Sequence, residues 1–264
     1  MTQSRAANAG LAAITGIVLL LLYGPILLPI LSSFFEVKQG SIDWAAPSLS
    51  SYAALVRNEG IVTALENTFI VGVSAVLASL CIGTLLALYY ASGRSLDREL
   101  LQFVVFLPFL MPPIITGLSL LVFFREIDFE RSLLTVVIGH TVFVLAIAYR
   151  TILVRLQSLG RSLTEASYDL GATPLQTFRH ILLPNLAGAM VGAGALSFAL
   201  SFDETLITIL VTGTDNTLPI RLWAMMRLGF TPDINALVAL VLGLTTLLCL
   251  LAMRQLVVAR DQRP

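Results

Sequence analysis

The chain has 264 residues, of which 57% are hydrophobic and 12% are charged, and its mean hydropathy is +0.89. This composition excludes an ordinary soluble globular domain and points to a membrane protein. The formal net charge is zero, so no overall field favours nucleic acid or an acidic partner. Cys81 and Cys249 both lie in apolar stretches, which argues against a disulfide framework or a cysteine-based metal site.

Six apolar runs, each bounded by polar or helix-breaking residues, occur along the chain. Each is long enough to cross about 30 Å of hydrocarbon at about 1.5 Å per helical residue. The runs cover residues 11–35, 67–91, 100–124, 133–153, 186–211 and 234–258. We therefore expect an all-α membrane protein with about six transmembrane helices, in which residues 1–264 form a single transmembrane domain. The first run exceeds the apolar core of a signal peptide and no clear cleavage site follows it, so we expect a retained helix.

The distribution of basic residues predicts which side of the membrane each connection occupies. One set of connections holds the larger number of arginines, and by the positive-inside rule this set is cytoplasmic. Its members are Arg5, Arg94, Arg98, Arg150, Arg155, Arg161, Arg179, Arg254, Arg260 and Arg263. The other set consists of Lys38, Arg57, Arg125, Arg131, Arg221 and Arg227. Both termini are therefore predicted to lie in the cytoplasm.

Two of the predicted external connections are longer than turns. Residues 36–66 form a long loop that contains Trp44 and a serine-rich patch. Residues 218–227 combine apolar side chains with Arg221 and Arg227, a pattern that predicts a short helix at the membrane interface.

The cytoplasmic connection of residues 155–184 carries the signals of two short helices. Ser162 and Glu165 have the spacing of a capping box, which predicts a helix from Leu163, and Gly171 stands where a left-handed residue ends a helix. The sequence Thr173-Pro174-Leu175-Gln176 repeats the capping spacing with proline at the first helical position. Pro184 is predicted to end the second helix before the next span. The apolar faces of such a pair have no core of their own, so they need lipid or another protein to cover them.

The residues of this connection resemble the EAA loop of binding-protein-dependent ABC importer permeases. The matching positions are Glu165, Ala166, Ser167, Gly171, Ala172, Phe178, Ile181, Leu182, Leu183 and Pro184. Ser167 departs from the pattern, because the family more often has alanine there. The resemblance implies the type I ABC importer permease fold, with a coupling helix between the fourth and fifth spans that docks on a cytoplasmic ATPase subunit. An ordinary interfacial hairpin, in which Glu165 only caps a helix, is the alternative.

Weaker similarities extend over about three quarters of the chain to the polyamine-type branch of these permeases. They include Leu107-Pro108-Phe109-Leu110-Met111-Pro112-Pro113, Ser201-Phe202-Asp203-Glu204 and Thr231-Pro232-Asp233-Ile234. The resemblance implies four kinds of partner: a second permease subunit of a related chain, a cytoplasmic ATPase dimer that binds ATP and magnesium, an external solute-binding protein, and membrane lipid. It implies import across the bacterial inner membrane of a polyamine or similar organic cation, although related permeases also carry opines and amino-phosphonates.

Asp203 and Glu204 are adjacent carboxylates within the predicted fifth span. Each costs about 2.5–3.5 kcal/mol at the centre of a lipid-facing helix, so they are expected to face a cavity, a partner helix or water. Adjacent helical residues point about 100° apart, so only one of them is expected to line a pathway. They form a gate that attracts a cation, or they pair within the permease dimer.

Other polar or helix-breaking features also lie within the predicted spans. Pro108, Pro112 and Pro113 interrupt the third span, which predicts either a kinked helix that lines the pathway or a packing kink. His140 stands alone in the fourth span, and a hydrogen bond to a neighbouring helix is favoured over a proton relay. Gly188, Gly192 and Gly194 predict close helix packing.

Two other classes of function compete with an importer permease. The single lysine, Lys38, rules out a phosphate-binding loop, so the chain itself is not expected to be a P-loop ATPase. We also expect no catalytic residues and no cofactor or metal in this subunit. A secondary transporter would show internal repeats and several buried charges, of which the sequence has few. An intramembrane enzyme would need a nucleophile with a base or a metal cluster, and His140 and His180 are the only histidines.

Overall fold

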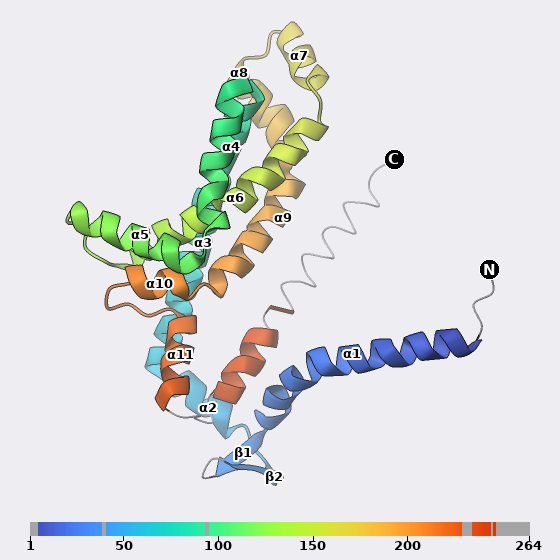
Figure 1. Ribbon diagram of the computed structural model, residues 1–264, viewed down its shortest axis with the longest axis vertical. Helices are drawn as coiled ribbons and strands as arrows, with labels where there is room; N and C mark the ends of the chain where they lie inside the picture. Colours follow the sequence, from blue (N-terminus) through green and yellow to red (C-terminus); the bar gives the residue numbers. More distant parts are fainter. Residues whose placement is uncertain (1–4, 39–40, 93–94, 229–233, 244, 247–264) are drawn as a thin grey trace. The chain divides into compact units, whose positions relative to one another are not determined.

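A computed structural model of the chain describes residues 5–38, 41–92, 95–228, 234–243 and 245–246. The described residues fall into two compact units. The first contains the residues up to Val62 and those from Ala224 onward, and the second contains residues Thr63–Trp223. Almost all described residues outside the connections are helical, as Figure 1 shows.

The first unit begins with a long apolar helix and a small hairpin. Its elements are α1 (Arg5–Ser32), β1 (Phe35–Lys38), β2 (Ser41–Pro47) and α2 (Ser50–Arg57). The strands are antiparallel, with Val37 opposite Ile42. The ring of Phe35 lies 5.1 Å from that of Trp44. This hairpin lies in the region where the sequence predicted the end of the first span and a long loop without strands.

Helix α1 ends three residues before the predicted end of the first span. The hydroxyls of Ser32 and Ser33 donate to the carbonyls of Pro29 and Ile30 at 3.0 and 2.6 Å. Local side-chain bonds of this kind compete with helix continuation. Ser33 also lies 2.8 Å from the hydroxyl of Tyr52 in α2, so the turn after α1 is held by side chains within the same unit.

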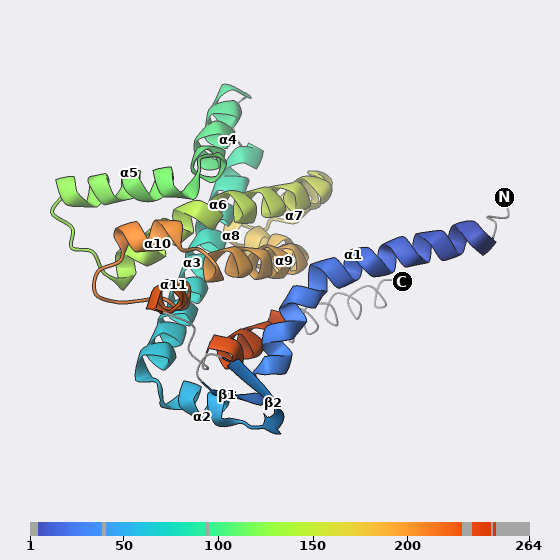
Figure 2. The same ribbon diagram turned by 60° about the horizontal axis from the view of Figure 1, so that its bottom comes forward.

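The second unit is a bundle around α6, which is visible in Figures 1 and 2. Its helices are α3 (Glu59–Ser92), α4 (Ser95–Leu110), α5 (Pro113–Glu126), α6 (Leu133–Ser158), α7 (Ser162–Asp169), α8 (Pro174–Thr177), the π-helix η1 (Phe178–Leu182), α9 (Leu183–Phe202), α10 (Leu206–Val211) and the start of α11 (Leu218–Leu228). Helix α6 packs against α4, α5, α9 and α10. In its apolar window 61% of the residues are buried, which makes α6 the central helix.

Two clusters of buried side chains run along α6. Tyr149, Ile152 and Leu153 form the first with residues of α3, α4 and α9. Val136 and Val144 belong to the second, which adds residues of α3, α5 and α10. Each cluster joins helices that are distant in sequence. Together they fix the helices on both sides of two breaks, one between α4 and α5 and one between α9 and α10.

Four described helices are long and apolar enough to cross a membrane. They are Gly10–Ser32, Glu59–Ser92, Leu133–Ser158 and Pro174–Phe202, and a bent pair formed by Arg98–Leu110 and Pro113–Glu126 would make a fifth. The sixth predicted span lies outside the described residues except for the apolar helix Ile234–Gly243 and residues 245–246.

The predicted third span is broken into α4 and α5, which are bent by 104° (Figure 2). Pro112 has φ −53° and ψ 133°, an extended conformation, because the residue before a proline is kept out of the helical region. Pro112 also has no N–H to donate to the carbonyl of Pro108. The Thr116 hydroxyl donates to that carbonyl instead, at 3.2 Å. The prolines therefore produce a sharp break rather than the predicted kink within one helix.

The short helix predicted at residues 218–227 is confirmed as helix α11, whereas its place at the membrane interface stays a prediction. Its first residue is tied to α3, because the backbone N–H of Leu218 donates to the Thr68 hydroxyl at 2.7 Å. The side chain of Asn67 donates to the carbonyl of Asn216 at 3.0 Å, so the connection before α11 is fixed at two points.

Candidate functional site

The 155–184 segment folds as the predicted pair of short helices, joined by a tight glycine turn. Gly171 has φ +79°, the left-handed conformation predicted for it. The N–H of Gly171 donates to the carbonyl of Tyr168, and the N–H of Ala172 donates to the carbonyl of Ser167. These two bonds make a Schellman motif, which satisfies the last carbonyls of α7.

The second helix begins with the predicted capping box. The N–H of Thr173 donates to the side-chain oxygen of Gln176 at 2.8 Å, and the Thr173 hydroxyl accepts from the N–H of Gln176. Pro174 occupies the first helical position, where its missing N–H costs nothing.

Pro184 does not end this helix, contrary to the prediction. The chain remains helical from Pro174 to Phe202, through α8, η1 and α9. The segment before the proline, Phe178–Leu182, widens into a π-helix. A π-helical turn changes the hydrogen-bond pattern locally, so the helix accommodates the missing N–H of Pro184 without stopping. One continuous helix therefore leads from the glycine turn into the bundle.

The capping box predicted at Ser162 is absent. Ser162 is the first residue of α7, and Arg161 before it is already in the helical region with φ −79° and ψ −25°. A capping residue needs an extended backbone for its side chain to reach the third N–H. Gly160, with φ +72°, turns the chain directly from α6 into α7 and removes that extended residue. Glu165 therefore makes no cap and is exposed.

A buried pair of hydroxyls joins the two short helices. Ser167 of α7 and Thr177 of α8 are 4% and 1% exposed, and their hydroxyl oxygens lie 2.8 Å apart. Thr177 donates to the carbonyl of Thr173 at 3.1 Å, so the Ser167 hydroxyl donates to Thr177. The serine that departs from the EAA pattern thus makes the contact between the helices.

Two leucine side chains near the glycine turn are exposed on the surface of the protein. Leu170 is 89% exposed and Leu175 is 73% exposed. The other predicted coupling residues divide into an exposed group, which is Glu165, Ala166, Gly171 and Pro184, and a half-buried group, which is Ala172, Phe178, Ile181 and Leu183. The turn therefore presents an uncovered apolar tip on a base that packs against the bundle.

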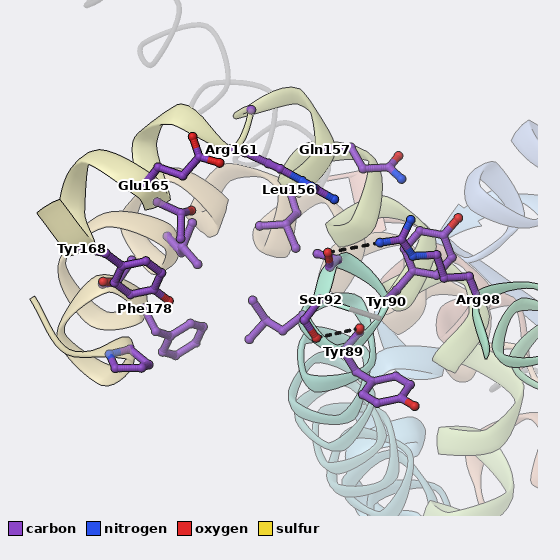
Figure 3. A pocket seen from close by; sticks show the side chains of 17 residues that line it. Tyr89, Tyr90, Ser92, Arg98, Leu156, Gln157, Arg161, Glu165, Tyr168 and Phe178 are labelled. Atoms are coloured by element: carbon purple, nitrogen blue, oxygen red, sulfur yellow. Dashed lines mark hydrogen bonds between the residues drawn. The ribbon is translucent and has the colours of Figure 1, made fainter. Parts of the chain in front are cut away.

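A cavity of about 720 Å³ separates this loop from the ends of α3, α4 and α6 (Figure 3). Glu165, Tyr168 and Phe178 line it from the loop, and Tyr90 and Arg98 line it from the opposite side. The guanidinium of Arg98 lies over the ring of Tyr90, 5.4 Å from its centre. Helix α7 packs mainly on α8, and the base of the second helix, at Phe178 and Leu182, packs in the buried cluster around α6.

Asp203 and Glu204 lie at a break between α9 and α10, not inside one span as the sequence predicted. Glu204 is 9% exposed, and its carboxylate accepts the N–H of Ile207 at 2.9 Å, which caps α10. Asp203 is exposed. The two carboxylates therefore differ in exposure, with Glu204 buried and Asp203 exposed.

The helices that follow the two breaks pack against each other. Helix α10 lies on α5 and α6. A side chain on Gly117 of α5 would come within 3.0 Å of the Ile207 backbone, and one on Gly139 of α6 would come within 2.8 Å of the Ile207 side chain. Helix α5, which begins after the break at Pro112, therefore packs against helix α10, which begins after the break at Asp203 and Glu204.

His140 is hydrogen-bonded to neighbouring helices, which confirms the favoured prediction. The side chain is 1% exposed. Its Nδ1 lies 2.7 Å from the hydroxyl of Ser201 in α9, and its Nε2 lies 2.7 Å from the hydroxyl of Thr208 in α10. The ring therefore bridges the two helices on either side of the Asp203–Glu204 break.

Several of these residues had no functional signal in the sequence interpretation. Thr208, Gly117 and Thr116 lie in apolar runs, where small and hydroxyl residues suggest only helix packing, and Ser201 entered only as part of the Ser201-Phe202-Asp203-Glu204 resemblance. The close approach at Gly194 is confirmed, whereas Gly188 and Gly192 meet nothing in the described chain. Among the described residues, no group of three or more His, Cys, Asp or Glu side chains is placed to hold a metal ion.

The bent α4–α5 pair, the broken fifth span and the glycine-turned helix pair belong to a helical membrane protein. The chain belongs to the family described as binding-protein-dependent transport system inner membrane component, whose model matches residues 79–263. It is a multi-pass membrane protein of that family.

Among similar proteins are polyamine permeases of Escherichia coli (strain K12). The chain is 34% identical over 250 residues to the putrescine transport system permease protein PotI, with 92% of this chain and 89% of the relative covered. It is 28% identical over 242 residues to the spermidine/putrescine transport system permease protein PotC, with 91% and 90% covered.

Solved structures of ABC importers share the fold. A bacterial ABC transporter that imports the acidic polysaccharide alginate matches with a TM-score of 0.72 and 16% identity, over 97% of this chain and 96% of that chain. The methionine ABC transporter MetNI matches with a TM-score of 0.62 and 23% identity, over 82% of this chain and 100% of that chain. The chain therefore has the fold of type I ABC importer permeases.

Proposed function

We propose that this subunit forms half of the translocation pathway of an ATP-driven importer and couples that pathway to a separate ATPase dimer. A second, related permease subunit completes the pathway, and an external binding protein delivers the solute. The observation that carries the proposal is the continuous helix Pro174–Phe202, which joins the exposed glycine turn to the Asp203–Glu204 break.

The glycine turn supplies the docking surface for the ATPase. Leu170 and Leu175 are 89% and 73% exposed at a tip held rigid by the Schellman motif and the Ser167–Thr177 bond. An apolar tip on a rigid base is costly in water unless a partner covers it. In the orientation predicted from the arginines, this tip faces the cytoplasm, where ATP is available, and both termini lie on the same side.

The continuous helix transmits movement from the turn to the pathway. It has 29 residues. At about 1.5 Å per residue it is roughly 44 Å long, enough to cross the bilayer. When the ATPase dimer closes and pulls the turn, the far end of the helix moves with it. The break at Asp203 and Glu204 then changes position against α5, and this change opens or closes the pathway.

The solute is proposed to be a polyamine or a similar organic cation. The exposed carboxylate of Asp203, at the far end of the helix, provides the negative charge that attracts a cation. The similarity to putrescine and spermidine/putrescine permeases supports the same class of solute. The binding protein sets much of the selectivity, so this subunit needs only a pathway of suitable charge.

Replacing the exposed tip of the turn tests the coupling. Leu170→Asp and Leu175→Asp should leave the chain folded, because both side chains are exposed, and should reduce co-purification of the ATPase by about tenfold or more, as expected for hot-spot residues. Val56→Asp is the matched control, because Val56 is 73% exposed on α2, on the predicted external side. Equal ATPase recovery from Leu170→Asp and Val56→Asp would overturn the proposed docking surface.

A further inference from the structure

A chain of hydrogen bonds crosses the joint between α9 and α10. It runs from the Ser201 hydroxyl to His140 Nδ1, from His140 Nε2 to the Thr208 hydroxyl, and from that hydroxyl to the backbone carbonyl of Glu204, with distances of 2.7, 2.7 and 2.9 Å. Ser201, His140 and Thr208 are all at most 2% exposed, so no water competes with these bonds.

The number of protons available fixes which group donates and which accepts in this series of hydrogen bonds. A hydroxyl has one proton, and Thr208 donates its proton to the carbonyl of Glu204. His140 must therefore donate from Nε2 to Thr208. The ring is 1% exposed and its hydrogen-bond partners among the described residues are uncharged hydroxyls, so burial favours the neutral imidazole. A neutral ring with its proton on Nε2 accepts at Nδ1 from Ser201.

We propose that His140 is the positioning residue that sets the geometry of the joint between α9 and α10, and with it the position of the Asp203 carboxylate. This inference rests on the proposed role of Asp203 in the pathway. Only residues Asp203–Thr205 connect the two helices along the chain. The His140 ring links both helices to α6, so α10 moves with α9 rather than swinging at the break.

The inference explains why the two carboxylates behave differently. The Glu204 carboxylate caps α10 through the N–H of Ile207, and its carbonyl receives the Thr208 proton, so both polar groups of Glu204 serve the joint. Asp203 is the remaining carboxylate and is exposed. A joint without the His140 link would leave Asp203 on a hinge and not at a fixed point of the pathway.

Hydroxyl substitutions test the role of the link in transport. Thr208→Val removes the acceptor of the His140 proton, and we expect the maximal rate of ATP-dependent putrescine uptake by the reconstituted complex to fall about tenfold. Thr208→Ser keeps the hydroxyl and should restore most of the rate. Thr141→Val is the matched control, because within the described part of the chain the Thr141 hydroxyl bonds the carbonyl of Val137 in its own helix and no other helix. Equal rates for Thr208→Val and Thr141→Val would overturn the proposal.

A double substitution separates a linked chain from independent contacts. Ser201→Ala should also lower uptake, and Ser201→Ala combined with Thr208→Val should be little worse than the more severe single variant, because both act through the same ring. Ser197→Ala, one turn earlier in α9, removes a buried hydroxyl that has no partner among the described residues and serves as the control. If the fold-loss of uptake rate in the double variant equals the product of the two single fold-losses, the two hydroxyls act independently and His140 is not the single positioning residue.

The protonated nitrogen of His140 gives a readout that does not depend on transport. The full chain contains two histidines, so 15N-histidine labelling of the chain in lipid gives two ring systems, and His180→Gln identifies the signal of His140. The expected spectrum at neutral pH is a neutral ring protonated at Nε2. A ring protonated at Nδ1, or at both nitrogens, would overturn the inference.

The two proposals fail in different ways. If the wild-type complex shows no ATP-dependent putrescine uptake, the proposed function fails for that solute, while the nitrogen spectrum still decides the hydrogen-bond chain. If the wild-type complex transports putrescine and the His140 ring shows the other tautomer, the function stands and the positioning role is wrong.

Discussion

Single polar side chains decide how the chain turns in this protein. Ser167 departs from the EAA pattern, yet its hydroxyl bonds Thr177 at 2.8 Å inside the helix pair. Thr116 supplies the proton that Pro112 lacks and satisfies the carbonyl of Pro108. Both side chains are buried, so each compensates for a backbone or packing group that would otherwise remain unpaired.

Ser167→Ala should loosen the helix pair without unfolding the bundle. The substitution removes one buried hydrogen bond, which contributes about 1 kcal/mol, so the amides of α7 and α8 should exchange with solvent about fivefold faster. Hydrogen exchange measured by mass spectrometry on the full complex tests this expectation. Ser162→Ala should leave exchange unchanged, because Ser162 is exposed and makes no cap.

Thr116→Val should destabilise the break between α4 and α5. The carbonyl of the half-buried Pro108 would lose this donor, and an unsatisfied carbonyl of a fully buried residue costs about 1–3 kcal/mol, which is an upper bound here. Thermal unfolding of the purified complex in lipid should therefore begin at a lower temperature for Thr116→Val than for Thr116→Ser, which keeps the hydroxyl. Identical unfolding of the two variants would show that the Thr116 bond does not support the break.

Local sequence signals were reliable where one residue type has one physical role. Gly171 was predicted to be left-handed because only glycine adopts that conformation at little cost, and Thr173 was predicted to cap a helix that starts at Pro174. Ser162 had the same capping spacing and failed, because Gly160 turned the chain one residue too early. The spacing of a motif does not report the backbone conformation that precedes it.

Two breaks and one continuous helix organise the elements of the second unit. The sequence predicted two whole spans, the third and the fifth, where the structure has a bent pair, α4 and α5, and a divided span, α9 and α10. Conversely, Pro184 was predicted to end a helix that continues to Phe202. Hydropathy reports which residues suit lipid, but where a helix breaks depends on which neighbours satisfy its backbone.

Gly171→Val should separate the roles of the turn and the helix. A β-branched residue is strained at φ +79°, so the turn should open and ATPase co-purification should fall by about tenfold, whereas Gly171→Asn should be tolerated. Pull-down of the ATPase from solubilised membranes gives the measurement. Full recovery with Gly171→Val would mean that the shape of the turn does not matter for docking.

Asp203 and Glu204 should respond differently to substitution. Glu204→Ala removes the cap of α10 and should lower the free energy of unfolding by about 1 kcal/mol. Asp203→Asn should leave stability unchanged, because the side chain is exposed, and should reduce uptake of a cationic solute. Thermal unfolding and uptake measured on both variants test the division. A stable Glu204→Ala chain together with an unstable Asp203→Asn chain would reverse the assignment.

The whole molecule shows how much hydropathy and a short motif predict together. The membrane class followed from composition, and membership of the permease family followed from about twenty residues around Gly171, which the family match over residues 79–263 confirms. The hairpin of β1 and β2 was missed, because its strands have only four and seven residues and the first follows an apolar helix almost directly, so the sequence predicted the end of a span and a loop there. The His140 link was only partly foreseen, because its partners are hydroxyls that lie 61 and 68 residues further along the chain.

Orientation in the membrane is testable at this scale. In a chain freed of its own cysteines, Leu170→Cys should react with a membrane-impermeant maleimide only from the cytoplasmic side, and Trp44→Cys only from the external side. Both positions are exposed, at 89% and 53%, so burial does not limit the reaction. Labelling of Leu170→Cys in intact cells would contradict the orientation predicted from the arginines.

We propose that ATP hydrolysis by a partner ATPase drives transport through this subunit. The decisive measurement is putrescine uptake into proteoliposomes that contain the complete complex. The binding protein is added on the external side of the membrane, and ionophores are present to collapse proton and sodium gradients. We expect uptake to require ATP hydrolysis, to persist with the ionophores and to be lost with Leu170→Asp. Uptake that continues without the ATPase and stops when an ion gradient is collapsed would contradict it and identify a secondary transporter.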